Sequence, residues 1–180
     1  LIASAADISG LAETVDGGAD SDLLSLTGGG LFDLSSATLA NLETIGLGSD
    51  ASASVILADS AVASGAMLTI DASAVTTSTN TVTVNGSLES DGAFNISGGS
   101  GSDSLSSGAG ADTLSGGDGA DVLTGGAGAD SLNGGGGNDI FIASAAGISG
   151  LAETVDGGAD SDLLSLSGGG LFDLSSATLA

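Results

Sequence analysis

A nine-residue repeat constrains this chain more than any other feature. Residues 98–142 read GGSGSDSLS, SGAGADTLS, GGDGADVLT, GGAGADSLN and GGGGNDIFI. The sixth residue of each block is an aspartate, and a large apolar residue follows two positions later. The glycines allow positive φ and close backbone approach, the aspartate supplies a hard anionic oxygen, and the apolar residue suits a core. Each block therefore predicts a tight turn followed by a very short strand.

The charge of the chain is entirely negative. Of 180 residues, 23 are Asp or Glu and none is Lys, Arg or His, which gives a net charge of −23. No internal cation neutralises these carboxylates, so a compact fold needs external counter-ions, and calcium suits a set of short, oxygen-bearing aspartates best. The same charge excludes nucleic acid and anionic membranes as partners, because both are contacted through Lys and Arg.

The apolar content is low for a folded protein of this charge. Leu, Ile, Val and Phe make up a quarter of the chain, and cysteine, tryptophan and tyrosine are absent. Stability must therefore come from packing and bound ions, and the metal-free chain is expected to lie near the composition of disordered proteins. No uninterrupted apolar run approaches the roughly 18 residues of a membrane span, so no insertion into a bilayer is expected.

A second, longer repeat organises the whole sequence. Residues 1–40 return as residues 141–180 with only three differences, Leu1/Phe141, Asp7/Gly147 and Thr27/Ser167. This fidelity at an offset of 140 residues predicts one full unit followed by the start of the next, within a longer tandem array. The alternative is a single protein with two similar caps, but terminal caps are normally atypical repeats.

Short β-prone runs fill the segment 1–97, where an acidic turn lies near residues 16–25. Runs bounded by Gly, Ser, Asn or Asp occur at 31–34, 44–47, 54–57, 68–70, 81–84 and 94–96. No amphipathic helical pattern accompanies them, and a segment such as 37–41 allows at most a single helical turn. The pattern predicts an all-β, parallel β-solenoid (β-helix) whose irregular coils over 1–97 run into a β-roll over 98–142, before the next unit starts at 141.

The repeat lengths also predict the size of one unit. Two nonapeptides make one coil, so five make two and a half coils. The other 95 residues, at about 24 per coil, make four more. With about 4.7 Å between stacked strands, one unit should advance the solenoid axis by roughly 30 Å.

The turns of the roll are candidate calcium sites. Calcium takes six to eight oxygens, more than one turn of this kind supplies, whereas two turns stacked one coil apart do supply them. Repeats n and n+2 should therefore share an ion. Five repeats allow about three complete Ca²⁺ sites, which pair turns 98–103 with 116–121, 107–112 with 125–130, and 116–121 with 134–139.

These five blocks resemble the RTX, or hemolysin-type calcium-binding, repeat family. The resemblance covers a quarter of the chain and implies a right-handed parallel β-roll, export by a bacterial type I secretion system, and folding in extracellular calcium. It implies carboxylate ligands at Asp103, Asp112, Asp121, Asp130 and Asp139, and backbone carbonyl ligands at Gly99, Gly101, Gly108, Gly110, Gly117, Gly119, Gly126, Gly128, Gly135 and Gly137. Ser107 replaces the first glycine of the second block, which is tolerable if that position does not need positive φ.

Two further acidic turns match the pattern less well. The sequence GGADSDLL at 17–24 returns at 157–164, with Asp instead of Gly at its fourth position. These turns are either isolated calcium turns or solvated acidic turns. Their candidate ligands are Asp20, Asp22, Asp160 and Asp162, with Asp16 and Asp156 as possible helpers. Asp118 also lies at a variable turn position, where it is expected to be solvated.

The residue types argue against an enzyme. Without His, Cys, Lys, Arg or Tyr, the chain has no ordinary general base, thiolate or cationic oxyanion stabiliser. The leading hypothesis is a structural, extracellular, calcium-stabilised solenoid. It would form the repeating unit of a fibre, surface layer or adhesin stalk, and it would self-associate end to end or side by side. The resemblance extends in style to large repetitive secreted bacterial adhesins and surface-layer proteins.

Two alternatives remain open. The chain is also interpretable as a calcium-dependent folding and secretion module of a secreted toxin or hydrolase, although such modules usually occur once. Ice binding is a further alternative. Thr76, Thr77, Thr79, Thr81 and Thr83 are suggestive, but they lie along one segment, whereas an ice face needs threonines on successive coils.

Overall fold

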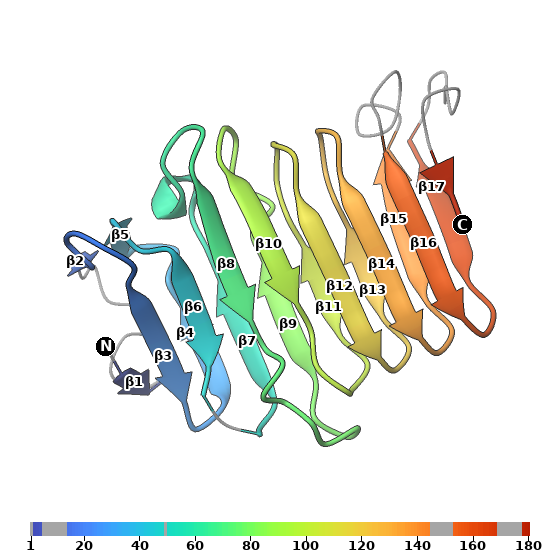
Figure 1. Ribbon diagram of the computed structural model, residues 1–180, viewed down its shortest axis with the longest axis horizontal. Coiled ribbons are helices and arrows are strands. Elements are labelled where there is room, and N and C mark those ends of the chain that lie inside the picture. The colour runs from blue at the N-terminus through green and yellow to red at the C-terminus, as the bar shows by residue number, and fades with distance from the viewer. Residues whose placement is uncertain (1, 5–13, 49, 145–152, 169–177) are drawn as a thin grey trace.

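Two long parallel sheets run along the molecule, in a computed structural model that describes residues 2–4, 14–48, 50–144, 153–168 and 178–180 (Figure 1). The nine-stranded sheet contains, in order, β1 (Ile2–Ser4), β3 (Leu23–Thr27), β6 (Thr44–Leu47), β8 (Met67–Asp71), β10 (Ala93–Ser97), β12 (Thr113–Asp118), β14 (Ser131–Gly136), β16 (Thr154–Ala159) and β18 (Thr178–Leu179). The seven-stranded sheet contains β17 (Leu163–Ser167), β15 (Ile140–Ser144), β13 (Val122–Thr124), β11 (Ser104–Ser106), β9 (Val82–Asn85), β7 (Ala53–Ile56) and β4 (Gly30–Asp33). Strands β2 (Thr14–Asp16) and β5 (Thr38–Ala40) pair separately.

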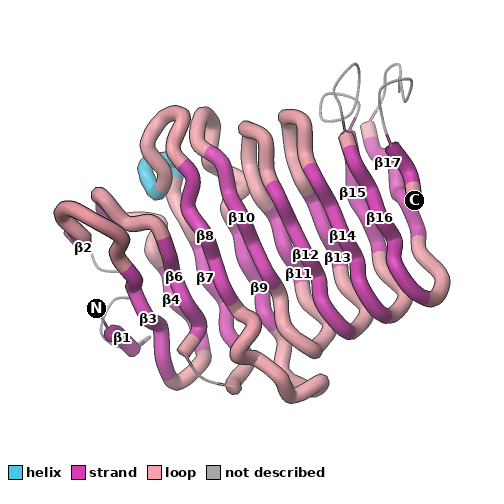
Figure 2. The backbone as a smooth tube through the Cα atoms, viewed as in Figure 1, coloured by secondary structure: helices cyan, strands magenta, loops and turns pink. Residues whose placement is uncertain are grey.

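The chain passes alternately through the two long sheets, so that each circuit forms one coil of a solenoid. Strand pairs within the described residues are all parallel, as in β10 with β12 and β11 with β13. Loops and turns connect the ends of the strands on both sides of the solenoid, and the two termini lie at its opposite ends (Figures 1 and 2). The predicted all-β parallel solenoid is confirmed.

The apolar positions of the nonapeptides form the core of the roll. The predicted core residues are between 0% and 4% exposed; they are Leu105, Leu114, Leu123, Leu132 and Phe141. They continue the row of buried aliphatic and aromatic side chains that begins in the irregular coils, where Phe32 and Phe94 are also buried. Burial of alternate side chains along strands such as β8, β10 and β12 holds the two sheets together.

The segment 37–41 contains a strand and no helical turn. Strand β5 pairs with β2 and buries Leu39. This pairing and burial favour an extended backbone over a helical one. The helical turn of the described residues lies instead at η1 (Asp59–Ala61), a 3-10 turn that buries Ala61.

Coil lengths agree with the prediction from the repeats. In the roll, Thr113 pairs with Ser131 and Ser104 with Val122, so 18 residues make one coil. The coils outside the roll are longer. For example, 26 residues separate the paired Met67 and Ala93.

The two copies of the 40-residue segment keep the same local pairing but occupy opposite sheets. Ile2 pairs with Ser25 in the first copy, and Ile142 pairs with Ser165 in the second. Strand β3 nevertheless belongs to the nine-stranded sheet, whereas its counterpart β17 belongs to the seven-stranded sheet. Along the nine-stranded sheet, β16 lies six strands beyond β3, and each of these strands belongs to a new coil. Strand β17 follows β16 in the opposite sheet, half a coil further on. One unit therefore spans six and a half coils, or roughly 30 Å.

Candidate functional site

Close stacking of the turns requires glycine at two turn positions. In the turn 116–121, Gly117 has φ +110° and Gly119 has φ +117°, values that residues with a Cβ rarely adopt. A Cβ on Gly117 would also collide with the carbonyl oxygen of Gly99 on the preceding coil. Ser107, at the first turn position, is not among the residues with positive φ, so serine is tolerated there.

The aspartates of alternate turns form a ladder of hydrogen bonds along one edge of the roll. The backbone N–H of Asp103 donates to Oδ1 of Asp121 at 2.7 Å. Asp121 donates in the same way to Oδ1 of Asp139 at 2.8 Å, and Asp139 donates to Oδ1 of Asp162 at 3.0 Å. We call these four residues the first ladder. The predicted stacking of turn n on turn n+2 is confirmed by this register.

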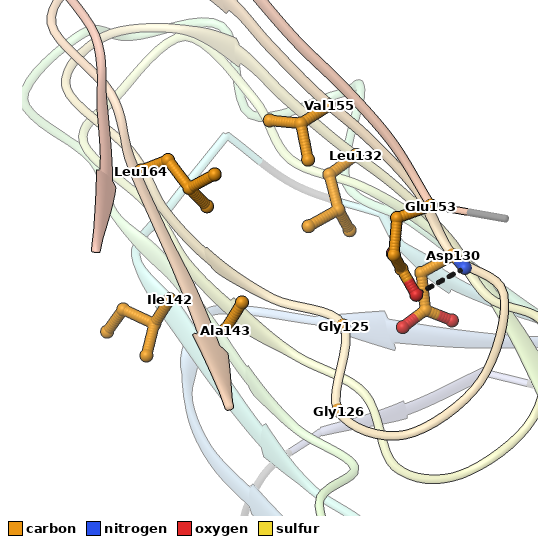
Figure 3. Close-up of a pocket in the computed structure, with 9 residues that line it drawn as sticks. All are labelled: Gly125, Gly126, Asp130, Leu132, Ile142, Ala143, Glu153, Val155 and Leu164. Atoms are coloured by element: carbon orange, nitrogen blue, oxygen red, sulfur yellow. Dashed lines mark hydrogen bonds between the residues drawn. The ribbon is translucent and has the colours of Figure 1, made fainter. Parts of the chain in front are cut away.

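The other turns form a second ladder, which ends in a glutamate. The N–H of Asp112 donates to Oδ1 of Asp130 at 2.9 Å, and the N–H of Asp130 donates to Oε1 of Glu153 at 3.2 Å (Figure 3). Glu153 is only 3% exposed and lines a cavity of about 10 Å³, close to the least volume that holds one water molecule. We call Asp112, Asp130 and Glu153 the second ladder.

Glu153 was not among the predicted site residues, although the sequence contains a signal for it. Each ladder residue directly precedes a strand, and an apolar residue follows it at the second position. Glu153-Thr154-Val155 has this spacing, as does Asp162-Leu163-Leu164. The nine-residue period does not reach Glu153, because 23 residues separate it from Asp130.

Three buried ladder aspartates each have one oxygen without a partner. Asp112, Asp121 and Asp139 are 0–1% exposed, yet their Oδ2 atoms accept no hydrogen bond. An unpaired buried carboxylate oxygen is costly unless a cation or another donor reaches it. No Lys, Arg or His exists in the chain to do so. These oxygens therefore fit a metal ion.

Burial also keeps the ladder carboxylates from ionising easily. Desolvation, with repulsion from Asp103 and Asp139, raises the pKa of Asp121 to about 7. Desolvation raises the pKa of Asp130 to about 6 and that of Glu153 to about 7. Bound calcium would favour the ionised forms of these groups.

Asp50 shows what a carboxylate with a purely structural role looks like in this protein. Its oxygens accept hydrogen bonds from the backbone and hydroxyl of Thr77 and from the side-chain amide of Asn80. These bonds, with Thr77 contributing most, lower the pKa of Asp50 to about 2. The unpaired, buried oxygens of the ladders are therefore a different kind of group.

Carbonyl oxygens from the turns would have to complete each shell, because within the described residues no three carboxylates are grouped to hold a metal ion. Oδ2 of Asp121 and the carbonyl oxygen of Gly134 both lie against Gly116, where a Cβ would clash with them. This carbonyl belongs to the first glycine of a turn, which was not among the predicted ligands.

The predicted carbonyls belong to the glycines at the second and fourth positions of each turn. Of these, the carbonyl of Gly99 accepts a hydrogen bond from Asp118 N at 3.2 Å, and that of Gly108 accepts one from Ala127 N at 2.9 Å. A carbonyl oxygen has two lone pairs, so a hydrogen bond leaves room for a ligand. Ligation by these carbonyls stays a prediction.

The acidic turns outside the nonapeptides differ from one another. Asp22 is half-buried, donates its N–H to Glu43 at 2.8 Å, and has an unpartnered Oδ2. Asp16 instead accepts hydrogen bonds from Gly18 N and from a side-chain amide, so it stabilises the turn. In the second copy Asp156 likewise accepts from the N–H two residues on, at 3.1 Å. Asp20, Asp118 and Asp160 are exposed.

Comparison with known proteins agrees with this geometry. A model of the RTX calcium-binding nonapeptide repeat, four copies long, matches residues 95–123 and 115–145. No curated protein and no solved structure gives a significant match to the chain. Among the described residues, the helices fall short of the length and apolar character needed to span a bilayer.

Proposed function

We propose that this chain, whose residues 95–145 carry RTX calcium-binding nonapeptide repeats, is a structural, calcium-stabilised solenoid of a secreted protein. The observation that carries the proposal is the pair of carboxylate ladders with unpartnered buried oxygens. In a chain of net charge −23 without any cationic side chain, calcium between stacked turns neutralises repulsion and satisfies these oxygens together.

In this proposal the ladder residues hold the ions. Asp103, Asp112, Asp121, Asp130 and Asp139 contribute carboxylate oxygens, and turn glycines contribute carbonyl oxygens. Bound ions would lock turn n onto turn n+2 and so convert weak strand stacking into a stiff rod. The free energy of calcium binding would then contribute directly to the free energy of folding, because the site does not exist in the unfolded chain.

A structural role in a fibre, surface layer or adhesin stalk is supported by the repetition. A 140-residue unit that recurs with three changes in 40 residues suits a protein that extends over a long distance or assembles into a periodic structure. Extracellular location and type I secretion suit a chain that stays unfolded where calcium is scarce. End-to-end self-association would suit a repeating solenoid of this kind, because its coils can continue to stack from one copy to the next.

A calcium titration followed by far-UV circular dichroism tests the proposal. We expect a cooperative gain of β-structure with calcium and none with equimolar magnesium, because Mg²⁺ keeps its waters and demands octahedral geometry. A chain that is fully β-structured in chelator, and unchanged by calcium, would show that packing alone holds the solenoid and that the aspartates are not ligands.

Ice binding remains a second candidate because of a polar row on the nine-stranded sheet. Facing residues on successive coils lie in register across six strands; they are Thr44, Thr69, Asn95, Thr113, Ser131 and Thr154. All six are exposed or half-buried. The threonines at 76–83 do not supply this row, since Thr76 and Thr77 donate to Asp50 in a loop.

Thermal hysteresis of the calcium-loaded chain separates this candidate from the first. Thr113→Tyr would interrupt the row and remove any hysteresis, whereas Ser104→Tyr, on the exposed side of the opposite sheet, would not. Absence of hysteresis in the unaltered chain eliminates ice binding and leaves the structural role intact.

A further inference from the structure

The turn 157–162 has the backbone of a roll turn although its sequence departs from the repeat. In the turn 134–139, the second and fourth residues, Gly135 and Gly137, have φ +103° and +118°. In the turn 157–162 the same positions are Gly158 and Asp160, with φ +87° and +79°. Aspartate is one of the few residues with a Cβ that enter this region readily. The substitution at the fourth position therefore leaves the turn conformation unchanged.

The same turn also lies in register on the last nonapeptide. Strands β14 and β16 pair Gly135 with Gly158 and Gly136 with Ala159, although 23 residues separate the partners instead of 18. A side-chain contact reinforces the stacking, since Ser161 N donates to Oδ1 of Asn138 at 3.0 Å. The longer connection therefore does not shift the turns relative to each other.

An unsatisfied buried oxygen lies between these two turns. Asp139 is 1% exposed, and its Oδ1 accepts from Asp121 N while its Oδ2 has no partner. A Cβ placed on Gly134 would clash with this Oδ2 and would lie 2.7 Å from the carbonyl oxygen of Gly157. The free oxygen and that carbonyl thus border the same space, in the same arrangement as Asp121 and Gly134 one coil earlier.

We propose that the turns 134–139 and 157–162 together bind an additional calcium ion, to which Asp139, Asp162 and the carbonyl of Gly157 contribute oxygens. Residues 157–162 lie outside the segment that matches the repeat family, which ends at residue 145. Asp162 accepts from Asp139 N and is exposed, so the ion would enter from solvent. The inference rests on the proposed calcium binding by the roll and extends it.

The position of this site gives it a distinct role. Asp139 closes the roll of one 140-residue unit, whereas Asp162 belongs to the segment that starts the next unit. An ion held by both would join the two units, so calcium would stiffen the junction as well as the roll. A turn near the start of each unit would then supply ligands to the last calcium site of the unit before it.

Native mass spectrometry of the calcium-loaded 180-residue chain tests the inference. We expect Asp162→Asn to bind one calcium ion fewer than the unaltered chain, with the other ions retained. Asp59→Asn is the matched control, because Asp59 is exposed on η1, outside the roll, and its removal should leave the count unchanged. Far-UV circular dichroism in calcium should show that both variants remain β-structured.

The outcomes are distinguishable. An unchanged ion count in Asp162→Asn overturns the junction site while calcium binding by the roll stands. If the unaltered chain binds no calcium at all, the proposed function fails and the junction site fails with it. Asp139→Asn provides a second reading, because it should also lose the junction ion, and a full count in that variant contradicts the inference.

Discussion

Glycine and aspartate have separate tasks in each turn of the roll. In the turns 116–121, 125–130 and 134–139, glycine at the second and fourth positions provides the positive φ and the absence of a side chain that let one turn lie against the next. The aspartates at 112, 121 and 139 each accept a backbone N–H at Oδ1 and have no hydrogen bond at Oδ2, whereas Oδ2 of Asp103 accepts the N–H of Gly99 at 2.7 Å. The local structure therefore presents an unpaired carboxylate oxygen at three of the ladder aspartates.

Substitution of one turn glycine should show how much close stacking matters. Gly117→Ala introduces strain of about 1–2 kcal/mol from positive φ, and a clash with the Gly99 carbonyl that costs about 1–3 kcal/mol more. Gly18→Ala is the matched control, because Gly18 has φ +94° but a Cβ there meets no described atom within 4 Å. Denaturant unfolding in calcium should give a clearly larger loss of stability for Gly117→Ala. Equal losses would mean that the turns have room to separate.

In the two ladders, the sequence predicts the register of the aspartates within the nonapeptides but does not predict the residues that close each ladder. The aspartate spacing predicts the 18-residue register of Asp103 on Asp121, and the structure has it. The closing members, Glu153 and Asp162, follow connections of 23 residues, so no period could predict that they stack. The approach of Oδ2 to the carbonyl of the first glycine of the next turn was also not predictable, because it depends on how closely the turns stack.

The metal-free roll should lose stability as pH rises. Burial raises the folded-state pKa of Asp121 to about 7 and of Glu153 to about 7, above their ordinary values of 3.8 and 4.5. The folded state thus holds protons that the unfolded state releases, and the stability they confer is complete below about pH 4 and disappears as pH rises through about 7. In chelator, we therefore expect far-UV circular dichroism to show more residual β-structure at pH 5 than at pH 8.

A double variant, Asp121→Asn with Glu153→Gln, serves as the control for this pH dependence. It removes two of the titrating groups, so the difference in residual β-structure between pH 5 and pH 8 in chelator should shrink. In excess calcium the order of the two pH values should reverse, because ligation requires ionised carboxylates. A content of β-structure in chelator that rises with pH would contradict the raised pKa values.

At the scale of the whole molecule, the repeat lengths in the sequence were sufficient to predict the number of coils in one unit. Five nonapeptides and 95 further residues predict six and a half coils per unit, and the strand order from β3 to β17 gives the same value. What the sequence did not indicate is the third, short pairing of β2 with β5, which depends on Leu39 being buried. Local propensity at residues 37–41 was too weak to decide between a turn and a strand.

The length of the particle should grow in proportion to the number of units. In calcium, a chain extended by one more 140-residue unit should have a maximum dimension larger by about 30 Å, since six and a half coils stack at about 4.7 Å each. Small-angle X-ray scattering of the two chains measures this increment. Units that fold separately on flexible connections would give a variable increment and a scattering curve of jointed particles.

The half coil left over in each unit has a consequence for any array of such units. Because β3 and its counterpart β17 lie in opposite sheets, a side chain that faces one side of the rod in one unit faces the other side in the next. The rod then has an approximate two-fold screw axis, and its orientation is restored only after two units, or 13 coils and about 61 Å. A rod of this symmetry presents every recognition feature on both flanks, so neighbours can attach to either side.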